Sequence, residues 1–263
     1  MASRAAAQMF TLREHTKTGR DFADALERVS KMGYPAVQLS AVGCMNGEAP
    51  EVNAADARKM LDDNGLKCIA THRSWDALSG TTEAEIAFHQ TLGCDYAAIG
   101  SLPGPYREKG AEGYAAFVKD SRPVSEQLRA AGITFGYHNH SFEFAPAGFG
   151  QRTCYDVLIE EGDALLALEI DTYWVQHGGS SPERLIERCA GRVPVIHVKD
   201  MGVDPKEGPV MTPIGEGNLD WDHILPACEK AGVNWYAVEQ DRCYRDPFDC
   251  LKSSFDFLSS KGV

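Results

Sequence analysis

Short apolar runs alternate with longer amphipathic stretches along the whole chain. The short runs are rich in β-branched and aromatic residues, as in strands that are buried on both faces. They predict strands at 8–14, 36–41, 67–72, 95–101, 134–140, 166–171, 193–199 and 235–241. The stretches between them carry apolar residues at helical spacing, and several end at a glycine. They predict helices at 21–32, 54–64, 82–92, 109–131, 153–161, 181–190, 221–231 and 247–260.

The regular strand–helix alternation indicates an α/β fold with a parallel sheet. Eight such units in 263 residues favour a closed (β/α)8 barrel, the TIM barrel, over an open doubly wound sheet. The open sheet would carry a G-x-G-x-x-G phosphate motif after its first strand, and TLREHTKTGR (11–20) has none. No linker or low-complexity tract interrupts the pattern, so we expect one domain spanning 1–263.

The charge balance restricts the classes of binding partner that we expect. The chain has 26 Lys and Arg against 38 Asp and Glu, a formal charge of −12. Such an acidic protein is poorly suited to nucleic acid or to an anionic membrane, and we expect neither as a partner. The eight cysteines are scattered without a C-x-x-C pair, as in a reduced protein. Without a membrane-length apolar run or a signal-peptide pattern, we expect a cytoplasmic location.

Polar residues collect where the predicted strands end. In TIM barrels the active site lies at the carboxyl ends of the strands. Strand 4 ends in Gly100 and Ser101 and is the exception. The other seven ends carry Glu14 and His15; Gln38 and Ser40; His72; His138, Asn139 and His140, with Glu143 just beyond; Glu169 and Asp171; His197, Lys199 and Asp200; and Glu239, Gln240 and Asp241.

Each of these residues alone would suit a helix cap or a structural hydrogen bond. Their recurrence on strands 5 to 8 is different, because the tips of neighbouring strands converge. Carboxylates and imidazoles brought together in this way suit Mn²⁺, Mg²⁺, Co²⁺ or Zn²⁺. The sequence therefore predicts a divalent metal site at this end of the barrel.

Five motifs resemble the sugar phosphate isomerase/epimerase family of the xylose-isomerase-like barrel superfamily. They are GYHNHSFEF (136–144), LEIDTYW (168–174), VIHVKDM (195–201), GEGNLDW (215–221) and YAVEQDRC (236–243). The resemblance runs over most of the chain and is strongest from 134 to 250. The motifs are specific for the superfamily but not for a substrate.

The resemblance implies one divalent metal ion, with Mn²⁺ expected first and Mg²⁺, Co²⁺ or Zn²⁺ as alternatives. The family holds it with Glu, Asp, His and Glu from strands 5 to 8. Carried over, these ligands include Asp171, His197 and Glu239. For strand 5 we favour Glu143 over His138, the residue that the simplest alignment places there.

The implied activity is that of an isomerase or epimerase acting on a small sugar or keto-sugar through an enediolate. Glu239 is one candidate base, and Glu143, His138 or His140 is the other. The alternative is a dehydratase or lyase acting on a keto-inositol or a 3-keto-sugar. A DNA-repair endonuclease and a non-catalytic sugar-binding barrel are less favoured. Trp174 stands where many relatives have histidine, which argues against a simple ketose 3-epimerase.

Five residues are expected to contact the substrate. They are Gln38, His72, Trp75, Lys199 and Glu216. Glu216 would be carried to the site by the glycine- and proline-rich segment 201–219, which is predicted to be a loop covering it. Glu169 is expected to orient a histidine. Relatives are often dimers or tetramers, so the resemblance also implies a homo-oligomer.

Overall fold

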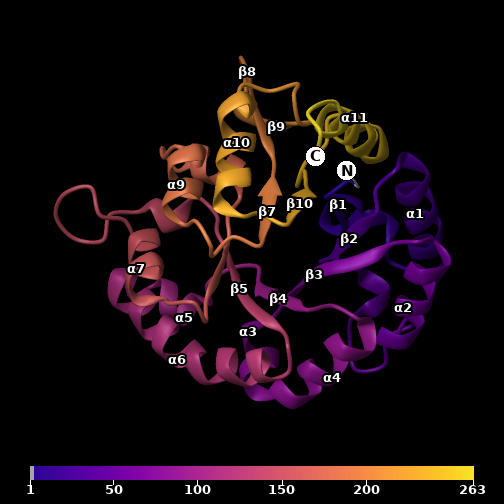
Figure 1. Ribbon diagram of the computed structural model, residues 1–263, viewed down its shortest axis with the longest axis horizontal. Helices are drawn as coiled ribbons and strands as arrows, with labels where there is room; N and C mark the ends of the chain where they lie inside the picture. The colour runs from indigo at the N-terminus through magenta and orange to yellow at the C-terminus, as the bar shows by residue number, and fades with distance from the viewer. Residues whose placement is uncertain (1–2) are drawn as a thin grey trace.

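Eight parallel strands form the centre of the computed structural model, which describes residues 3–263. They are β1 (Ala5–Gln8), β2 (Ala36–Leu39), β3 (Lys67–Arg73), β4 (Tyr96–Ile99), β5 (Thr134–His138), β6 (Ala167–Glu169), β7 (Val195–Val198) and β10 (Trp235–Val238). The sheet order β6-β5-β4-β3-β2-β1-β10-β7 makes β1 the neighbour of β10. Helices surround these strands, as Figure 1 shows, so the fold is the predicted TIM barrel.

The barrel closes between β6 and β7. The two strands meet through an isolated parallel bridge between Asp171 and His197. The amide of His197 donates a hydrogen bond of 2.8 Å to the carbonyl of Ile170. The seam therefore brings together two of the residues that the sequence marked as metal ligands.

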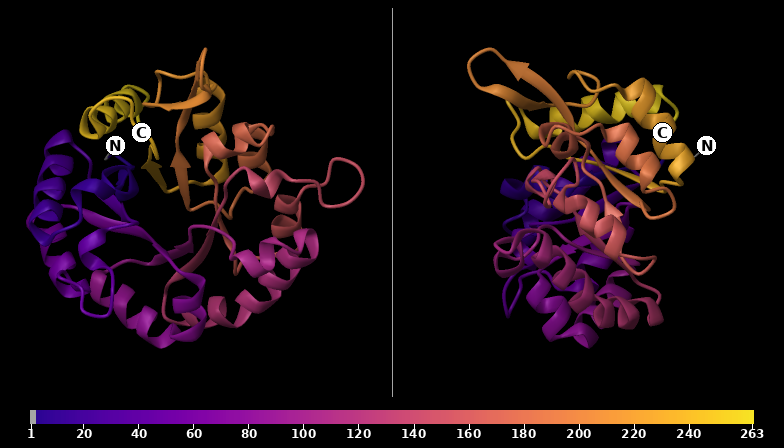
Figure 2. Two further views of the ribbon diagram at one scale, coloured as in Figure 1. Left: turned by 180° about the vertical axis from the view of Figure 1, so that it is seen from behind. Right: turned by 90° about the vertical axis from the view of Figure 1, so that its left-hand side faces the viewer.

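The principal helices agree closely with the sequence prediction. They are α1 (Gly19–Met32), α2 (Ala54–Asp63), α4 (Thr82–Leu92), α6 (Gly110–Ala130), α7 (Cys154–Glu161), α9 (Pro182–Arg188), α10 (Trp221–Ala231) and α11 (Pro247–Ser260). Local chemistry fixes many ends: the Thr18 hydroxyl caps the start of α1, and Gly33 follows its end at φ 106°. Both views in Figure 2 show the helices outside the strands.

The sequence prediction missed several short elements. These are α3 (Trp75–Gly80), α5 (Gly104–Arg107), α8 (Thr172–His177) and the 3-10 turns η2 (Gly43–Met45) and η3 (Phe142–Phe144). Each is too short to show a helical repeat of apolar positions. All eight cysteines are unpaired, as expected. Within residues 3–263, none of the helices has the length and apolar character needed to cross a membrane.

The first strand was predicted too late in the chain. It comprises Ala5–Gln8, and the expected strand 8–14 is mostly the 3-10 helix η1 (Met9–His15). Three successive alanines carry little strand propensity, yet they fit where β1 lies between two neighbouring strands. Glu14 and His15 therefore do not end this strand, and the polar residue at its tip is Gln8.

The segment 201–219 is not helical, as predicted, but much of it is regular. Strands β8 (Asp200–Asp204) and β9 (Gly208–Thr212) form an antiparallel hairpin that projects from the barrel in Figure 2. The part after the hairpin is fixed by Asp200. Its carboxylate accepts hydrogen bonds from the amides of Gly215, Gly217 and Leu219 and from the indole of Trp221. The GEGNLDW motif is thus bound to the Asp of VIHVKDM.

The barrel interior contains two layers of side chains. The lower layer is small and apolar, comprising Ala6, Ala36, Ile69, Ala70, Tyr96, Ala98, Ala167, Val195 and Ala237. Tyr96 is its largest member, and it requires the space that Gly136 leaves. A Cβ at Gly136 would lie 2.1 Å from the Tyr96 hydroxyl oxygen. The upper layer, one inward position further along the strands, is polar.

Candidate metal centre

The upper layer of the barrel is a cluster of polar side chains, all buried except His72 and Asp241, which are partly exposed. It comprises Gln8, Gln38, His72, His138, Glu169, His197 and Glu239, with Asp171, Lys199 and Asp241 above them. Strand β4 contributes no polar side chain to it. At the end of that strand, a Cβ on Gly100 would lie 3.1 Å from His72 Nδ1, so glycine gives the imidazole room.

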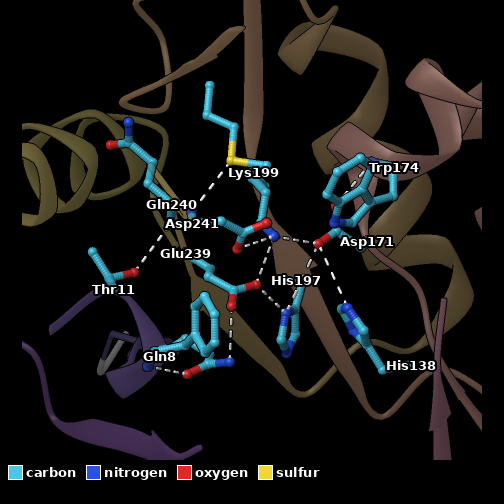
Figure 3. Close-up of polar contacts among 12 residues, drawn as sticks. Gln8, Thr11, His138, Asp171, Trp174, His197, Lys199, Glu239, Gln240 and Asp241 are labelled. Atoms are coloured by element: carbon cyan, nitrogen blue, oxygen red, sulfur yellow. Dashed lines mark hydrogen bonds and ion pairs between the residues drawn. The ribbon is translucent and has the colours of Figure 1, made fainter. Parts of the chain in front are cut away.

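Four residues of this cluster could hold one metal ion. His138, Asp171, His197 and Glu239 each present one ligand atom, and these atoms all lie within 4.8 Å of one another. They come from the ends of β5, β6, β7 and β10. Their carboxylate oxygens and imidazole nitrogens suit a first-row divalent cation. Figure 3 shows their side chains pointing toward one another.

Asp171 occupies the centre of this group. Its Oδ2 lies 3.9 Å from His138 Nε2 and 4.0 Å from His197 Nδ1. Its Oδ1 caps helix α8 by accepting a hydrogen bond from the amide of Trp174, at 3.0 Å. The cap fixes the carboxylate so that Oδ2 faces the cluster. Oδ2 is buried and already faces one cation, the Lys199 ammonium at 2.9 Å, so positive charge is stabilised at this point.

Glu169 lies below the group and contacts the far side of both histidines. Its Oε2 is 3.3 Å from His138 Nδ1, 3.2 Å from His197 Nε2 and 2.5 Å from His72 Nε2. The carboxylate therefore orients the two rings, leaving His138 Nε2 and His197 Nδ1 to face Asp171. This is the kind of contact expected for Glu169. His72 joins it to form a second, overlapping group of possible ligands with His138, Glu169 and His197.

Two glutamines complete this arrangement. Gln38 donates a 3.0 Å hydrogen bond to Glu169, and its carbonyl oxygen lies 2.8 Å from His197 Nε2. Gln8 donates a 3.0 Å hydrogen bond to Glu239 Oε1. Gln38 is fully buried, so it positions the charged residues. Gln8 was missed as a site residue because β1 was placed too late in the chain.

Lys199 supplies a buried positive charge beside the group. Its ammonium lies 2.9 Å from Asp171 Oδ2, 2.8 Å from Glu239 Oε2 and 2.9 Å from Asp241 Oδ1. Burial alone would lower the pKa of Lys199, but the three carboxylates outweigh it and raise that pKa, so the ammonium stays charged. Four carboxylates, those of Glu169, Asp171, Glu239 and Asp241, surround this cation and His197.

Burial and these neighbouring charges shift the pKa values of the candidate ligands in different directions. Burial raises the pKa of Asp171 to about 6, despite the nearby charge of Lys199. Burial also acts on Glu239, but the charges of Lys199 and His197 outweigh it and hold its pKa well below the usual range. Burial, followed by the charge of His197, lowers the pKa of His138. His138 is therefore neutral and Glu239 ionised, the forms in which each could bind a cation.

Glu143, the favoured ligand from strand 5, lies outside both groups. Its carboxylate is fully buried and accepts hydrogen bonds from the Tyr137 hydroxyl at 2.7 Å and from the His140 amide at 2.8 Å. Burial raises its pKa to about 7. The structure instead places His138 among the four residues that could hold a metal ion. The reason is that β5 ends at His138, while Glu143 belongs to η3, which turns back onto Tyr137.

Two of the predicted substrate residues are engaged elsewhere. Trp75 begins α3 and packs against Phe117 and Phe135, between helices and sheet. Glu216 is exposed and forms an ion pair with Arg245 and a hydrogen bond with Ser253. The structure brings neither into the cluster. The hairpin β8–β9 absorbs most of the segment that was expected to carry Glu216 inward.

The aromatic residue beside the cluster is Trp174, a role that the sequence did not predict. Its ring centre lies 5.4 Å from that of His140 and 5.7 Å from the Lys199 ammonium. The indole Nε1 of Trp174 and Nδ1 of His140 are both buried without a hydrogen-bond partner. Burial lowers the pKa of His140 to about 4, so its ring is neutral. In Figure 3, Trp174 lies next to Asp171, whose carboxylate accepts a hydrogen bond from the Trp174 backbone amide.

The comparisons with known proteins give the class. The family model described as xylose isomerase-like TIM barrel matches residues 26–261, so the chain belongs to that family. None of the curated proteins matches the chain.

Solved structures agree on the fold. Two sugar phosphate isomerase/epimerase structures from Parabacteroides distasonis ATCC 8503 are similar to this chain. One has a TM-score of 0.81 at 21% identity, covering 99% of this chain and 95% of its own. The other has a TM-score of 0.79 at 24% identity, covering 98% of each. The IOLI protein, solved with a zinc atom, has a TM-score of 0.68 at 15% identity and covers 98% and 97%. At these identities the likeness shows the fold alone.

Proposed function

We propose that this protein is a divalent-metal-dependent isomerase or epimerase that moves a proton next to the carbonyl of a small sugar or keto-sugar. The observation that carries the proposal is the buried group of His138, Asp171, His197 and Glu239 at the carboxyl end of the barrel. A bound divalent ion would supply a Lewis acid that stabilises the negative charge developing on substrate oxygen. The zinc atom in the structure of the IOLI protein supports this use of the fold.

His140 is the residue best placed to accept the proton. Its Nδ1 has no hydrogen-bond partner, and its low pKa keeps the ring neutral at physiological pH. Glu239 is less free, because Gln8 binds one of its oxygens and His197 and Lys199 contact the other. A base that is unpaired and unprotonated is able to take a proton from carbon without first losing a partner.

Trp174 and His140 form the wall against which the substrate would lie. An indole face next to an imidazole suits the apolar face of a sugar ring, and the free Nε1–H of Trp174 would donate to a hydroxyl. The catalytic assignment is therefore His140 as base, with Trp174 and His72 as substrate-binding residues. His138, Asp171, His197 and Glu239 hold the metal, and Glu169 orients the two histidines.

A second candidate is a metal-dependent dehydratase or lyase acting on a keto-inositol or a 3-keto-sugar. The observation in its favour is the neutral His138 in the group and the burial of Glu143 away from it. One base on one face suffices to remove a proton and expel a β-substituent, whereas inversion at carbon needs a second group on the opposite face.

The experiment is a deuterium-exchange screen of keto-sugars and keto-inositols in D₂O, followed by NMR, with chelated and metal-reloaded protein. Exchange at one carbon that requires metal supports the isomerase or epimerase. Loss of water or of a glycosidic substituent supports the lyase. Asp171→Ala and Glu239→Ala should abolish both the exchange and metal uptake, and Asp256→Ala, at an exposed ion pair, should change neither. If the wild-type protein takes up no divalent ion, the proposal is wrong.

A further inference from the structure

Lys199 competes with a metal ion for the same oxygens. Its ammonium lies within 3 Å of Asp171 Oδ2 and Glu239 Oε2, at 2.9 and 2.8 Å. These two oxygens also face His197 Nδ1, at 4.0 and 2.8 Å. Since the side chain is only 1% exposed, its charge is as deeply buried as the ligands themselves. Two cations close together at such a depth repel each other strongly.

A third carboxylate offers the Lys199 ammonium an alternative position. Lys199 donates a hydrogen bond to Asp241 Oδ1, at 2.9 Å. Asp171 Oδ2 and Glu239 Oε2 lie equally close, at 2.9 and 2.8 Å. The ammonium therefore contacts three carboxylates at once, and Asp241 would still be available to it if a metal ion occupied the other two. Asp241 lies outside both groups of possible metal ligands.

The surroundings of Lys199 restrict how far its ammonium travels. The backbone is fixed on both sides, because the Thr172 hydroxyl accepts from the Lys199 amide at 2.9 Å and donates to its carbonyl at 2.8 Å. Asp241 is fixed too, since its amide donates to Met211 Sδ and its carbonyl accepts from Arg13. The flexible lysine stem thus leaves the ammonium free to move only between neighbouring fixed acceptors.

We propose that Lys199 is an exchangeable internal cation, which neutralises Asp171 and Glu239 in the metal-free protein and withdraws to Asp241 when a divalent ion binds. In this role Lys199 lowers the affinity of the site for metal, and in the metal-free protein it offsets the repulsion between the carboxylates of Asp171 and Glu239. The inference rests on the proposed metal site. It assigns Lys199 a task distinct from contacting the substrate, which was the expectation from sequence.

The test measures metal binding and stability rather than turnover. Chelator-treated wild type, Lys199→Met and Asp241→Asn are titrated with Mn²⁺ and with Zn²⁺ by calorimetry, and melted with and without metal. The control is Lys252→Met, which removes a lysine from an exposed ion pair with Asp256. Methionine keeps most of the apolar length of the Lys199 side chain and removes the ammonium group with its charge.

The two site variants should shift in opposite directions. Lys199→Met should bind the ion at least about tenfold more tightly, about 1.4 kcal/mol, because a competing cation is gone. Its metal-free form should melt at a lower temperature than wild type, and added metal should raise that temperature more. Asp241→Asn should bind the ion more weakly, because the ammonium loses its alternative partner. Lys252→Met should match wild type.

The outcomes separate this inference from the proposed function. If wild type binds metal and Lys199→Met binds it equally or less tightly, the exchange is wrong and the metal site stands. If only Lys199→Met binds metal, the lysine is the resident cation, and the metal dependence proposed above fails. If neither binds, both are wrong. If metal-free Lys199→Met does not fold, the metal affinity of Asp241→Asn is decisive. Metal binding by Asp241→Asn that is tighter than or equal to that of wild type would overturn the proposed movement of Lys199.

Discussion

The two layers inside the barrel come from the same strands yet serve different purposes. On β5, Gly136 belongs to the lower layer and His138 to the upper; on β10, the corresponding pair is Ala237 and Glu239. The lower layer packs Tyr96 among alanines, whereas the upper layer holds charges against one another. Since inward positions recur every second residue, one strand supplies both a packing residue and a site residue without conflict.

The effects of substitutions on stability and on the metal site should therefore differ between the two layers. A change in the lower layer should alter stability and spare the metal site. A change in the upper layer should alter the site, and it should also lower stability where it leaves a buried charge without its partner.

Glu239→Gln should abolish metal uptake and turnover. Glutamine keeps the shape but removes the charge that faces His197 and Lys199, and its neutral amide oxygen is a much weaker ligand for a divalent cation than a carboxylate. Metal content and exchange in D₂O measure the result, and a cooperative urea transition shows that the barrel remains folded. Retained metal uptake would remove Glu239 from the ligand set.

Glu143→Gln should make stability less dependent on pH while leaving metal uptake intact. Burial raises the folded-state pKa of Glu143 to about 7, above its ordinary value. The folded protein therefore binds this proton more tightly than the unfolded chain, and the resulting stability is present at low pH. It is lost as pH rises through about 7, a loss of about 3 kcal/mol for this shift.

Urea unfolding at pH 5 and pH 7.5 measures this difference. The change between the two pH values should be smaller in Glu143→Gln than in wild type, and the same as wild type in Glu126→Gln, an exposed position on α6. Loss of metal uptake in Glu143→Gln would restore the assignment made from sequence, in which Glu143 is the ligand from strand 5.

Gly136→Ala should destabilise the lower layer by about 1–3 kcal/mol, because its methyl group would overlap the Tyr96 hydroxyl. The metal stoichiometry should not change. The control is Gly80→Ala in α3, where a Cβ would meet nothing within 4 Å. Urea unfolding compares the two, and a loss of metal together with a small loss of stability would show that the layers are not separable.

Glu216→Gln should have the smallest effect. Its ion pair with Arg245 is about half exposed on both sides, with side chains 40% and 46% accessible, so removing it should cost no more than about 1 kcal/mol. Turnover should match wild type. A marked loss of turnover at unchanged stability would mean that Glu216 reaches the substrate after all.

Regular patterns were easily predicted from sequence. The eight principal helices have the expected positions because each carries an apolar face and local end signals, such as Thr18 and Gly33 around α1. The strand β1 was misplaced because Ala5–Gln8 has no strand signal of its own. The short helix α8 was missed although it matters most for the site, since it holds Asp171 as its cap.

For the site, residue types and strand ends were predictable and the contacts were not. The sequence marked Asp171, His197 and Glu239 together, but it favoured Glu143 where the structure offers His138. It expected an aromatic wall at Trp75, and the structure places Trp174 beside the cluster. The first difference lies within a few residues, because η3 turns Glu143 back onto Tyr137. The second concerns two tryptophans far apart in the chain, and the packing of α3 and α8 decides which of them lies beside the cluster.

The sequence by itself determined the alternation of strands and helices, and with it the barrel and the end of the barrel that carries the polar residues. Only the tertiary structure decided that Lys199 would meet three carboxylates and that Glu169 would face three histidines. The physical reason is distance along the chain. Strand periodicity is encoded within a few neighbouring residues, whereas these contacts join strand ends up to about a hundred residues apart, as His72 and Glu169 are, and depend on how the barrel closes.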